Sequence, residues 1–186
     1  EILEAAERIF VAEGYEGATI RKIADEVGVS STALYMHFPD KACILVEITK
    51  RTITQLLERN AEIAAKPIDA GERARQMLDS YMRWGLEHPN AYLLVFSSTG
   101  TPSEVRGESL EGLSARCYEI FTGVFREIAA QGRLRRGDAD SAAQALWMAC
   151  HGVVALRITR PLVDWAPDAE LLTITLDSLM DGLVAP

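Results

Sequence analysis

Residues 19–41 read TIRKIADEVGVSSTALYMHFPDK, and this stretch decides the fold of the first part of the chain. Its apolar residues recur at steps of three or four, which is the spacing of one face of an α-helix. Gly28 interrupts the pattern, and Ile23 before it and Leu34 and Phe38 after it would face a common core. We therefore expect two short helices joined by a sharp turn, which together form a helix-turn-helix.

The outward face of the second short helix is the candidate functional surface. If Leu34 faces inward, Ser31, Thr32, Tyr35 and Met36 face outward. Small polar side chains on a short exposed helix suit the major groove of DNA, which is about 12 Å wide. Any pair of packed helices shows a similar pattern, so the spacing alone leaves both DNA binding and a purely structural role open.

Local signals indicate where these helices begin and end. We expect Gly14 to end a first helix in a left-handed conformation, which glycine adopts without strain. Thr19 is expected to cap the second helix, and Ser30 or Ser31 the third. Val29 is expected to fill the angle between the second and third helices.

The rest of the chain also reads as helical, because no segment alternates strictly between apolar and polar residues over six or more positions. The composition changes near Lys66, Pro67 and Gly71. We predict an all-α fold with a helix-turn-helix domain at residues 1–50 and a larger helical domain at 51–186. Residues 97–107 are expected to form a loop.

Composition excludes several classes of protein. The chain has 186 residues and 48% apolar residues, typical of a folded protein, and no apolar run long enough for a membrane span. No secretion signal is present, so we expect a soluble cytoplasmic protein. The three cysteines are scattered, and no hydrolase, metalloprotease or nucleotide-binding motif occurs, so we expect no metal, no cofactor and no enzymatic activity.

The net charge of −8 weighs against a nucleic-acid binder, although binding depends on a local patch rather than on the whole chain. Residues 19–41 hold three basic and three acidic side chains, so this stretch is neutral within an acidic protein.

The first fifty residues resemble the N-terminal domain of the TetR family of transcriptional regulators. The resemblance runs without a gap through Gly14-Tyr15, Gly28-Val29-Ser30, Leu34-Tyr35, His37-Phe38 and Asp40-Lys41. It implies a homodimer, a divergent helical ligand-binding domain and a palindromic DNA operator. Members of the family also tend to have a basic arm before the first helix; this sequence begins at Glu1.

The resemblance also assigns roles to individual residues. Thr19 and Arg21 match phosphate contacts, and Lys41 matches a phosphate-binding lysine at the start of the fourth helix. Ser31 stands where many members have lysine, and Ala33 where threonine is frequent, which removes one charge and one hydrogen bond. The residues predicted to bind DNA are Thr19, Arg21, Ser30, Ser31, Thr32, Ala33, Tyr35, Met36, His37 and Lys41.

Resemblance is weaker in the second domain, where Trp147…His151-Gly152 is similar to a Trp-His-Gly pattern of one subgroup. Trp147 and His151 share a helix face, and His151 could be the polar anchor of a mostly apolar ligand pocket. Ordinary core packing is the alternative. The residues predicted to bind a small-molecule effector are Tyr81, Trp84, Tyr92, Phe96, Cys117, Phe121, Trp147 and His151.

The last two helices are predicted to form a dimer interface. The final helix is apolar on more than one side, and the helix before it carries small residues that permit close approach. The alternative is that both helices are central in a monomer. The predicted interface residues are Ala142, Ala145, Ala149, Gly152, Leu172, Leu176, Leu179 and Leu183.

We therefore predict a dimeric transcriptional repressor that binds double-stranded operator DNA and is released by a small molecule. The alternative is a helix-turn-helix regulator or interaction module without a small-molecule ligand.

Overall fold

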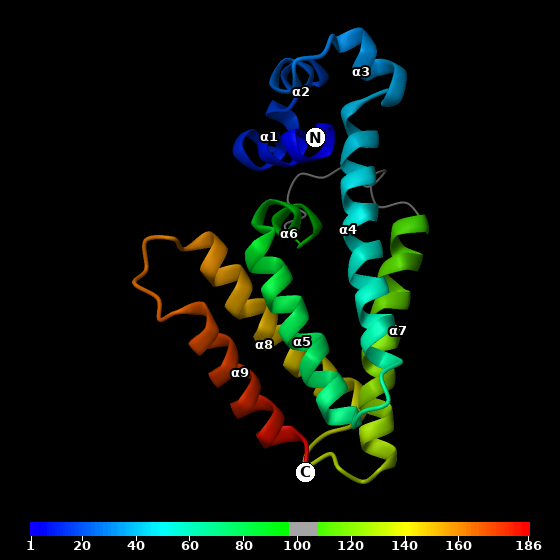
Figure 1. Ribbon diagram of the computed structural model, residues 1–186, viewed down its shortest axis with the longest axis vertical. Coiled ribbons are helices and arrows are strands. Elements are labelled where there is room, and N and C mark those ends of the chain that lie inside the picture. Colours follow the sequence, from blue (N-terminus) through cyan, green and yellow to red (C-terminus); the bar gives the residue numbers. More distant parts are fainter. Residues whose placement is uncertain (97–107) are drawn as a thin grey trace. The chain divides into compact units, whose positions relative to one another are not determined.

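The computed structural model describes residues 1–96 and 108–186, and this part of the chain is helical as predicted (Figure 1). The loop predicted at 97–107 lies outside the described residues. Within those ranges the one strand-like pairing is a single bridge between Leu134 and Val184. The helices are α1 (Ile2–Gly17), α2 (Ile20–Val27), α3 (Ser31–His37), α4 (Lys41–Ala64), α5 (Ala70–Glu87), α6 (Pro89–Phe96), α7 (Glu108–Ala130), α8 (Ala139–Thr159) and α9 (Asp168–Leu183).

The chain forms two compact units, which we call unit one and unit two. Among the described residues, unit one contains 1–55, 88–96 and 108–114, and unit two contains 56–87 and 115–186. Helices α4 and α7 each contribute residues to both. Helix α6 and the start of α7 belong to unit one, where α6 packs against α1. The domain boundary at residue 50 stays a prediction about the sequence.

The core of unit one joins the helix-turn-helix to its two flanking helices. Phe10 of α1, Ile23 of α2, Leu34 of α3 and Ile48 of α4 are all buried in one cluster. Phe38, at the end of α3, is partly buried against the same cluster. The inward positions that the spacing predicted are therefore confirmed, and α3, only seven residues long, depends on Leu34 for its attachment.

The predicted caps are confirmed at the helix-turn-helix. The Thr19 side chain accepts a hydrogen bond from the Lys22 backbone N–H at 3.2 Å. Ser30, rather than Ser31, caps α3. Gly28 is left-handed, with φ 71° and ψ 28°, and ends α2. These contacts fix the angle between α2 and α3 through the backbone.

Two local expectations need correction. Val29 does not fill the angle between the helices, because its side chain is 40% exposed and the core there is closed by Leu34. Gly14 has the expected positive φ of 73°, but its ψ of 172° is extended rather than left-handed helical. The chain therefore kinks at Gly14 and makes a further helical stretch to Gly17 instead of ending there.

Unit two is built on α5, α8 and α9, which contact one another pairwise (Figure 1). Its buried side chains include Met82, Leu146, Val154 and Leu172. Asp138 caps α8 by accepting a hydrogen bond from the Ser141 N–H at 2.8 Å, as is usual for an aspartate at a helix start.

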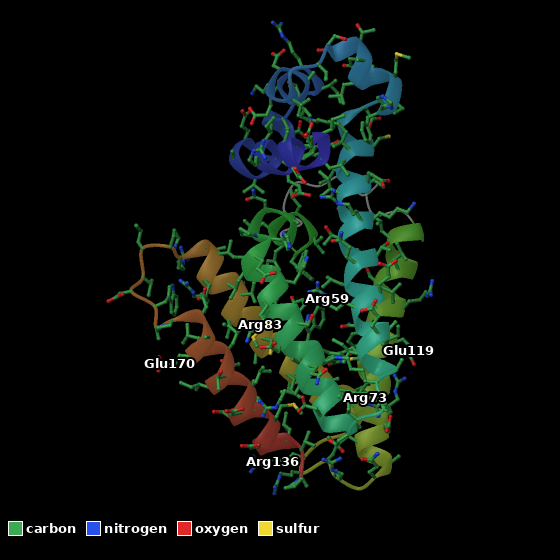
Figure 2. All side chains as sticks on the ribbon, viewed as in Figure 1. Arg59, Arg73, Arg83, Glu119, Arg136 and Glu170 are labelled. Atoms are coloured by element: carbon green, nitrogen blue, oxygen red, sulfur yellow. The ribbon has the colours of Figure 1, made fainter. Side chains whose placement is uncertain are left out.

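Ion pairs connect α5 to its neighbours in unit two. Arg73 pairs with Glu127 of α7 at 2.6 Å, and Arg75 pairs with Asp177 of α9 at 2.6 Å. Figure 2 shows Arg73 and Arg83 on α5, where Arg83 pairs with Asp79 one turn away. Because these pairs are partly exposed, each contributes little to stability and serves mainly to fix the register of the helices.

Two further properties concern all described residues. None of the described helices combines the length and the apolar character that crossing a bilayer requires. Across residues 1–96 and 108–186, no three His, Cys, Asp or Glu side chains gather closely enough to hold a metal ion.

Candidate nucleic-acid interface and effector region

Three of the four side chains that the sequence predicted on the outward face of α3 are exposed. Thr32, Tyr35 and Met36 are exposed, whereas Ser31 and Ala33 are half-buried. We call Thr32, Tyr35 and Met36 the α3 face. Met36 is 83% exposed and Tyr35 54%, both high values for large apolar residues. His37 is also exposed at the end of the helix.

The two capping hydroxyls can serve a second purpose. Each of Thr19 and Ser30 accepts a backbone N–H, and a hydroxyl that accepts a hydrogen bond still has its own proton to donate. Both residues are exposed at the starts of α2 and α3. They can therefore donate to phosphate oxygens without losing the caps, which is the role that the resemblance gives Thr19.

The basic side chains near α2 and α3 differ in how strongly other groups of the protein already bind them. Arg21 is highly exposed, and its pair with Asp25 is long at 3.8 Å, so its guanidinium can turn to a phosphate. Lys22 is engaged by the Glu13 carboxylate and by the Gly17 carbonyl at 3.0 Å. Arg21 is therefore the better candidate for a phosphate contact.

Lys41 binds the end of α1 in this structure. Its Nζ donates to the carbonyls of Tyr15 at 2.6 Å and Ala18 at 3.2 Å, and it lies 4.3 Å from the centre of the Tyr15 ring. The start of α4 is occupied as well, because Asp40 Oδ1 accepts the Cys43 N–H at 2.8 Å, which lowers the pKa of Asp40. A phosphate at this position would compete with both contacts, so direct phosphate binding by Lys41 stays a prediction.

Six of the eight predicted effector residues lie in unit two. The other two, Tyr92 and Phe96, belong to α6 in unit one, where their ring centres are 4.8 Å apart and Tyr92 is buried. Trp84 and Phe121 are buried core residues of unit two. The burial of Tyr92, Trp84 and Phe121 fits core packing, the alternative given above, and their role in effector binding stays a prediction.

A smaller group in unit two keeps polar atoms near aromatic rings. Tyr81 Oη and His151 Nδ1 are 3.0 Å apart, and the rings of His151 and Trp147 lie edge to face at 6.5 Å. Trp147 also contacts the Tyr118 ring, with centres 6.1 Å apart. Burial lowers the pKa of His151, so its ring is neutral at pH 7. We call Tyr81, Tyr118, Trp147 and His151 the aromatic cluster.

Sequence reasoning missed Tyr118. Its hydroxyl oxygen is buried and has no hydrogen-bond partner among the described residues. Cys117 beside it accepts a hydrogen bond from Asn60 Nδ2 at 3.6 Å, and burial raises the pKa of its thiol. The spacing of Tyr118 to Phe121 and Phe125, three and seven residues on, is a helical stripe that could have indicated it.

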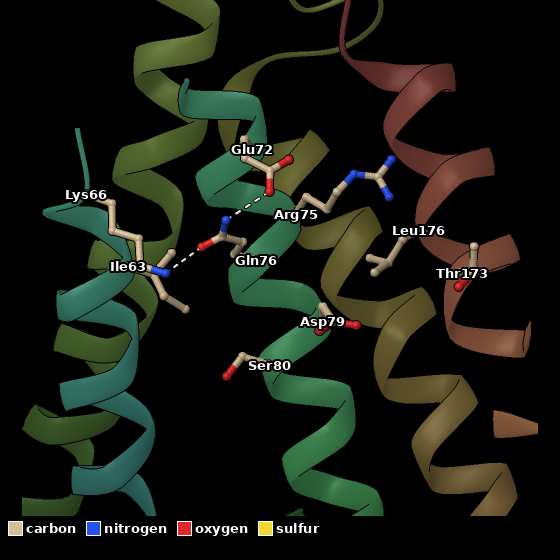
Figure 3. A pocket seen from close by; sticks show the side chains of 9 residues that line it. All are labelled: Ile63, Lys66, Glu72, Arg75, Gln76, Asp79, Ser80, Thr173 and Leu176. Carbon is tan, nitrogen blue, oxygen red and sulfur yellow. Dashed lines mark hydrogen bonds between the residues drawn. The ribbon is translucent and has the colours of Figure 1, made fainter. Parts of the chain in front are cut away.

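A separate open groove of about 400 Å³ lies between α4, α5 and α9 of unit two (Figure 3). None of the predicted effector residues lines it. In Figure 3, Gln76 bridges Glu72 and Lys66 across one side, with distances of 2.9 and 2.7 Å. The charged groups that line it are already engaged: Gln76 bonds both Lys66 and Glu72, Arg75 pairs with Asp177, and Asp79 pairs with Arg83. The groove is therefore a less suitable effector site than the aromatic cluster.

Burial divides the predicted dimer interface into two groups. Ala142, Leu172 and Leu176 are at most 3% exposed within a single chain, so these side chains belong to the core of the protomer. The core of unit two already covers these three, and their place in a dimer interface stays a prediction. Ala145 is exposed, and the half-buried members are Ala149, Gly152, Leu179 and Leu183.

The unpartnered apolar surface of α8 and α9 lies elsewhere on the same helices. Met148, Leu156 and Ile174 are 64%, 48% and 55% exposed. Ala145 and Gly152 share the helix face of Met148 and Leu156, because their positions differ by multiples of about one turn. We call Ala145, Met148, Gly152, Leu156 and Ile174 the α8–α9 face.

Together, the helix-turn-helix and the attached helical unit define a DNA-binding regulator of the all-α class. The family model "Bacterial regulatory proteins, tetR family" matches residues 2–48, and "Tetracyclin repressor-like, C-terminal domain" matches residues 74–179. The chain therefore belongs to the TetR family of transcriptional regulators.

Individual relatives agree with this assignment. The chain is 26% identical over 187 residues to the HTH-type transcriptional repressor KstR2 of Rhodococcus jostii, covering 100% of this chain and 91% of KstR2. It is 40% identical over 62 residues to the repressor AcnR of Corynebacterium diphtheriae, a match that spans only 33% of each protein. The crystal structure of the TetR-family regulator PfmR from Thermus thermophilus superposes with a TM-score of 0.83 at 26% identity, covering 100% of both chains.

Proposed function

We propose that the protein is a repressor that binds an inverted-repeat operator as a homodimer and releases it when a small molecule binds unit two. The observation that carries the DNA-binding part is the α3 face, held outward by the buried Leu34 and by the Ser30 cap. A short helix presented in this way fits the major groove, and two copies related by a twofold axis would read the two halves of an inverted repeat.

The α8–α9 face supports the homodimer. Three large apolar side chains, Met148, Leu156 and Ile174, are exposed on α8 and α9, which favours an interaction site there, and Ala145 and Gly152 would let another helix approach closely. Two helices from each subunit would form a four-helix interface, and an obligate interface of this kind buries on the order of 2,000 Å² or more. Three half-buried residues of the predicted interface, Ala149, Leu179 and Leu183, would lie at the border of this four-helix interface.

The aromatic cluster supports regulation by a small molecule. A buried hydroxyl without a partner costs roughly 1–3 kcal/mol, so the Tyr118 hydroxyl would gain from a ligand that accepts its proton. Tyr81 and His151 form a second polar pair in the cluster, and the Trp147 ring contacts both the His151 ring and the Tyr118 ring. Helix α4 contributes Asn60 to unit two and begins at Lys41 in unit one, so it is a covalent path between effector and operator sites.

The test of regulation is reciprocity between the two sites. Native mass spectrometry of the purified protein identifies a compound that copurifies with it, and that compound is titrated with and without operator DNA. We expect operator to weaken compound binding by the factor by which the compound weakens operator binding, typically 5–150-fold. Tyr118→Phe should weaken compound binding and leave operator affinity without the compound unchanged. Equal compound affinities with and without operator would favour the regulator without a ligand.

A further inference from the structure

Helix α3, which would enter the major groove, lacks the side chains that most often read bases. From Ser31 to His37 the sequence is STALYMH, with no Arg, Lys, Asn, Gln, Asp or Glu. Arginine or lysine pairs with guanine, asparagine or glutamine with adenine, and an acidic side chain with cytosine. None of these pairings is available to α3. What remains is hydroxyl contact, the imidazole of His37 and apolar contact. His37 lies only about 60° around the helix from the inward Leu34, off the outward face. The apolar group that the major groove offers to the outward face is the 5-methyl of thymine.

The geometry of α3 selects the residue for this contact. Leu34 is 1% exposed and defines the inward direction. At about 100° per residue, Thr32 and Met36 each lie about 160° around the helix from Leu34, so both point directly outward. Met36 is the longer of the two and has 83% of its surface exposed.

The distribution of apolar exposure in unit one points the same way. Among the described residues of this unit, the exposed large apolar side chains are Val29, Tyr35 and Met36, all within the turn and α3. An unbranched thioether is flexible and polarizable, and it adapts to irregular apolar surfaces. Met36 therefore offers the largest apolar contact at the centre of the α3 face.

We propose that Met36 determines operator sequence by packing on the 5-methyl group of a thymine in each half-site. This inference rests on the proposed function and names the base chemistry that α3 reads. Thr32, one turn earlier, would contribute its hydroxyl to the same edge. The operator is thus read by contact with a thymine methyl rather than by a charged side chain that hydrogen-bonds to guanine.

The experiment removes one methyl group at a time. A duplex is first selected from a random library by the purified full chain, and each thymine is then replaced by deoxyuridine, which lacks only the 5-methyl. Burying a methyl-sized group is equivalent to about fourfold in affinity, or about 15-fold when both half-sites change. We expect the affinity of the wild-type protein to fall by this factor when one particular thymine in each half-site is replaced.

The variants identify the side chain responsible. Met36→Ala should bind the thymine and uracil duplexes equally at that position, whereas Thr32→Ser, which keeps the hydroxyl, should retain the difference. Leu162→Ala is the control, because it removes an apolar side chain of unit two that is 99% exposed and lies outside the α8–α9 face, so it should change neither affinity nor the thymine preference. All measurements use one salt concentration, since phosphate contacts depend on salt.

Three outcomes would overturn the inference. If no thymine is sensitive to loss of its methyl, methyl reading fails while the proposed function stands. If Met36→Ala keeps the full thymine preference, another residue reads the methyl. If the library yields no enriched duplex, the proposed function fails and this inference with it.

Discussion

Lys41 connects the start of α4 to the end of α1 through its ammonium group. Removing that group leaves the carbonyls of Tyr15 and Ala18 without their donor. We expect Lys41→Ala to lower the free energy of unfolding by about 1.5–3 kcal/mol, the usual value for a hydrogen bond to a charged group. Because α1 supports the start of α2, affinity should fall to a similar extent for operator and for unrelated DNA.

Urea unfolding and fluorescence anisotropy on both duplexes measure these two effects. Lys50→Ala is the control, since Lys50 is exposed on the same helix. A Lys41→Ala protein with unchanged overall affinity but altered sequence preference would show that Lys41 reads bases instead.

His151 gives unit two a pH dependence at the scale of one residue. Burial lowers its pKa below the ordinary value of 6.5, so folding disfavours the protonated ring. Its contribution is therefore complete above pH 6.5 and is lost as the pH falls through the lowered pKa. Protonation at Nδ1 would also prevent the ring from accepting the Tyr81 hydroxyl proton.

We expect the wild-type protein to lose more stability than His151→Gln between pH 7.5 and 5. Thermal unfolding at both pH values measures the difference. A loss that is equal in the two proteins would assign the pH dependence to other groups.

At the scale of the element, Gly28 controls the turn between α2 and α3. Its φ of 71° is strained for any residue with a side chain, even though no atom lies within 4 Å of the added Cβ. Gly28→Ala should therefore cost about 1–2 kcal/mol. Gly112→Ala is the matched control in unit one, because Gly112 is helical and equally open, and there alanine should stabilise by about 0.5–1 kcal/mol.

Chemical denaturation measures the free energy of unfolding of the two variants. We expect it to fall in Gly28→Ala and to rise in Gly112→Ala, although the substitution is the same. If Gly28→Ala left the stability unchanged or raised it, the positive φ of Gly28 would not be a requirement of the turn.

The elements could be predicted from the sequence where their signals are local. Thr19, Ser30 and Asp138 cap helices by accepting N–H groups three residues on, and that spacing can be read directly. The exposure of Val29 could not be predicted from the sequence, because it depends on which side chain closes the core. The bonds of Lys41 could not either, because its partner carbonyls lie more than twenty residues earlier in the chain.

The two candidate sites also differ in whether their signals are local in the sequence. The α3 face could be predicted because a single inward residue fixes the orientation of a seven-residue helix. The effector region could not be predicted as a whole, because an aromatic residue in a helical sequence fits either a core or a pocket. The unpartnered hydroxyl of Tyr118 appears only once the side chains are placed in three dimensions.

At the scale of the whole molecule, the α8–α9 face should hold two chains together. Ile174→Glu would place a charge in that interface, and we expect a dimer that dissociates to folded monomers. Ile68→Glu is the control, because Ile68 is also exposed but lies outside the face. Sedimentation velocity at micromolar concentration measures both proteins. If Ile174→Glu and the wild-type protein sediment with the same mass, the α8–α9 face is not the interface.

Operator recognition by a symmetric pair of α3 helices is the central claim, and selection of duplexes from a random library by the purified chain tests it most directly. We predict enrichment of an inverted repeat whose half-site centres are about 34 Å apart, one turn of DNA, or a multiple of that distance. A pool without any enriched sequence, or one enriched in a single half-site without its inverted copy, would contradict the account.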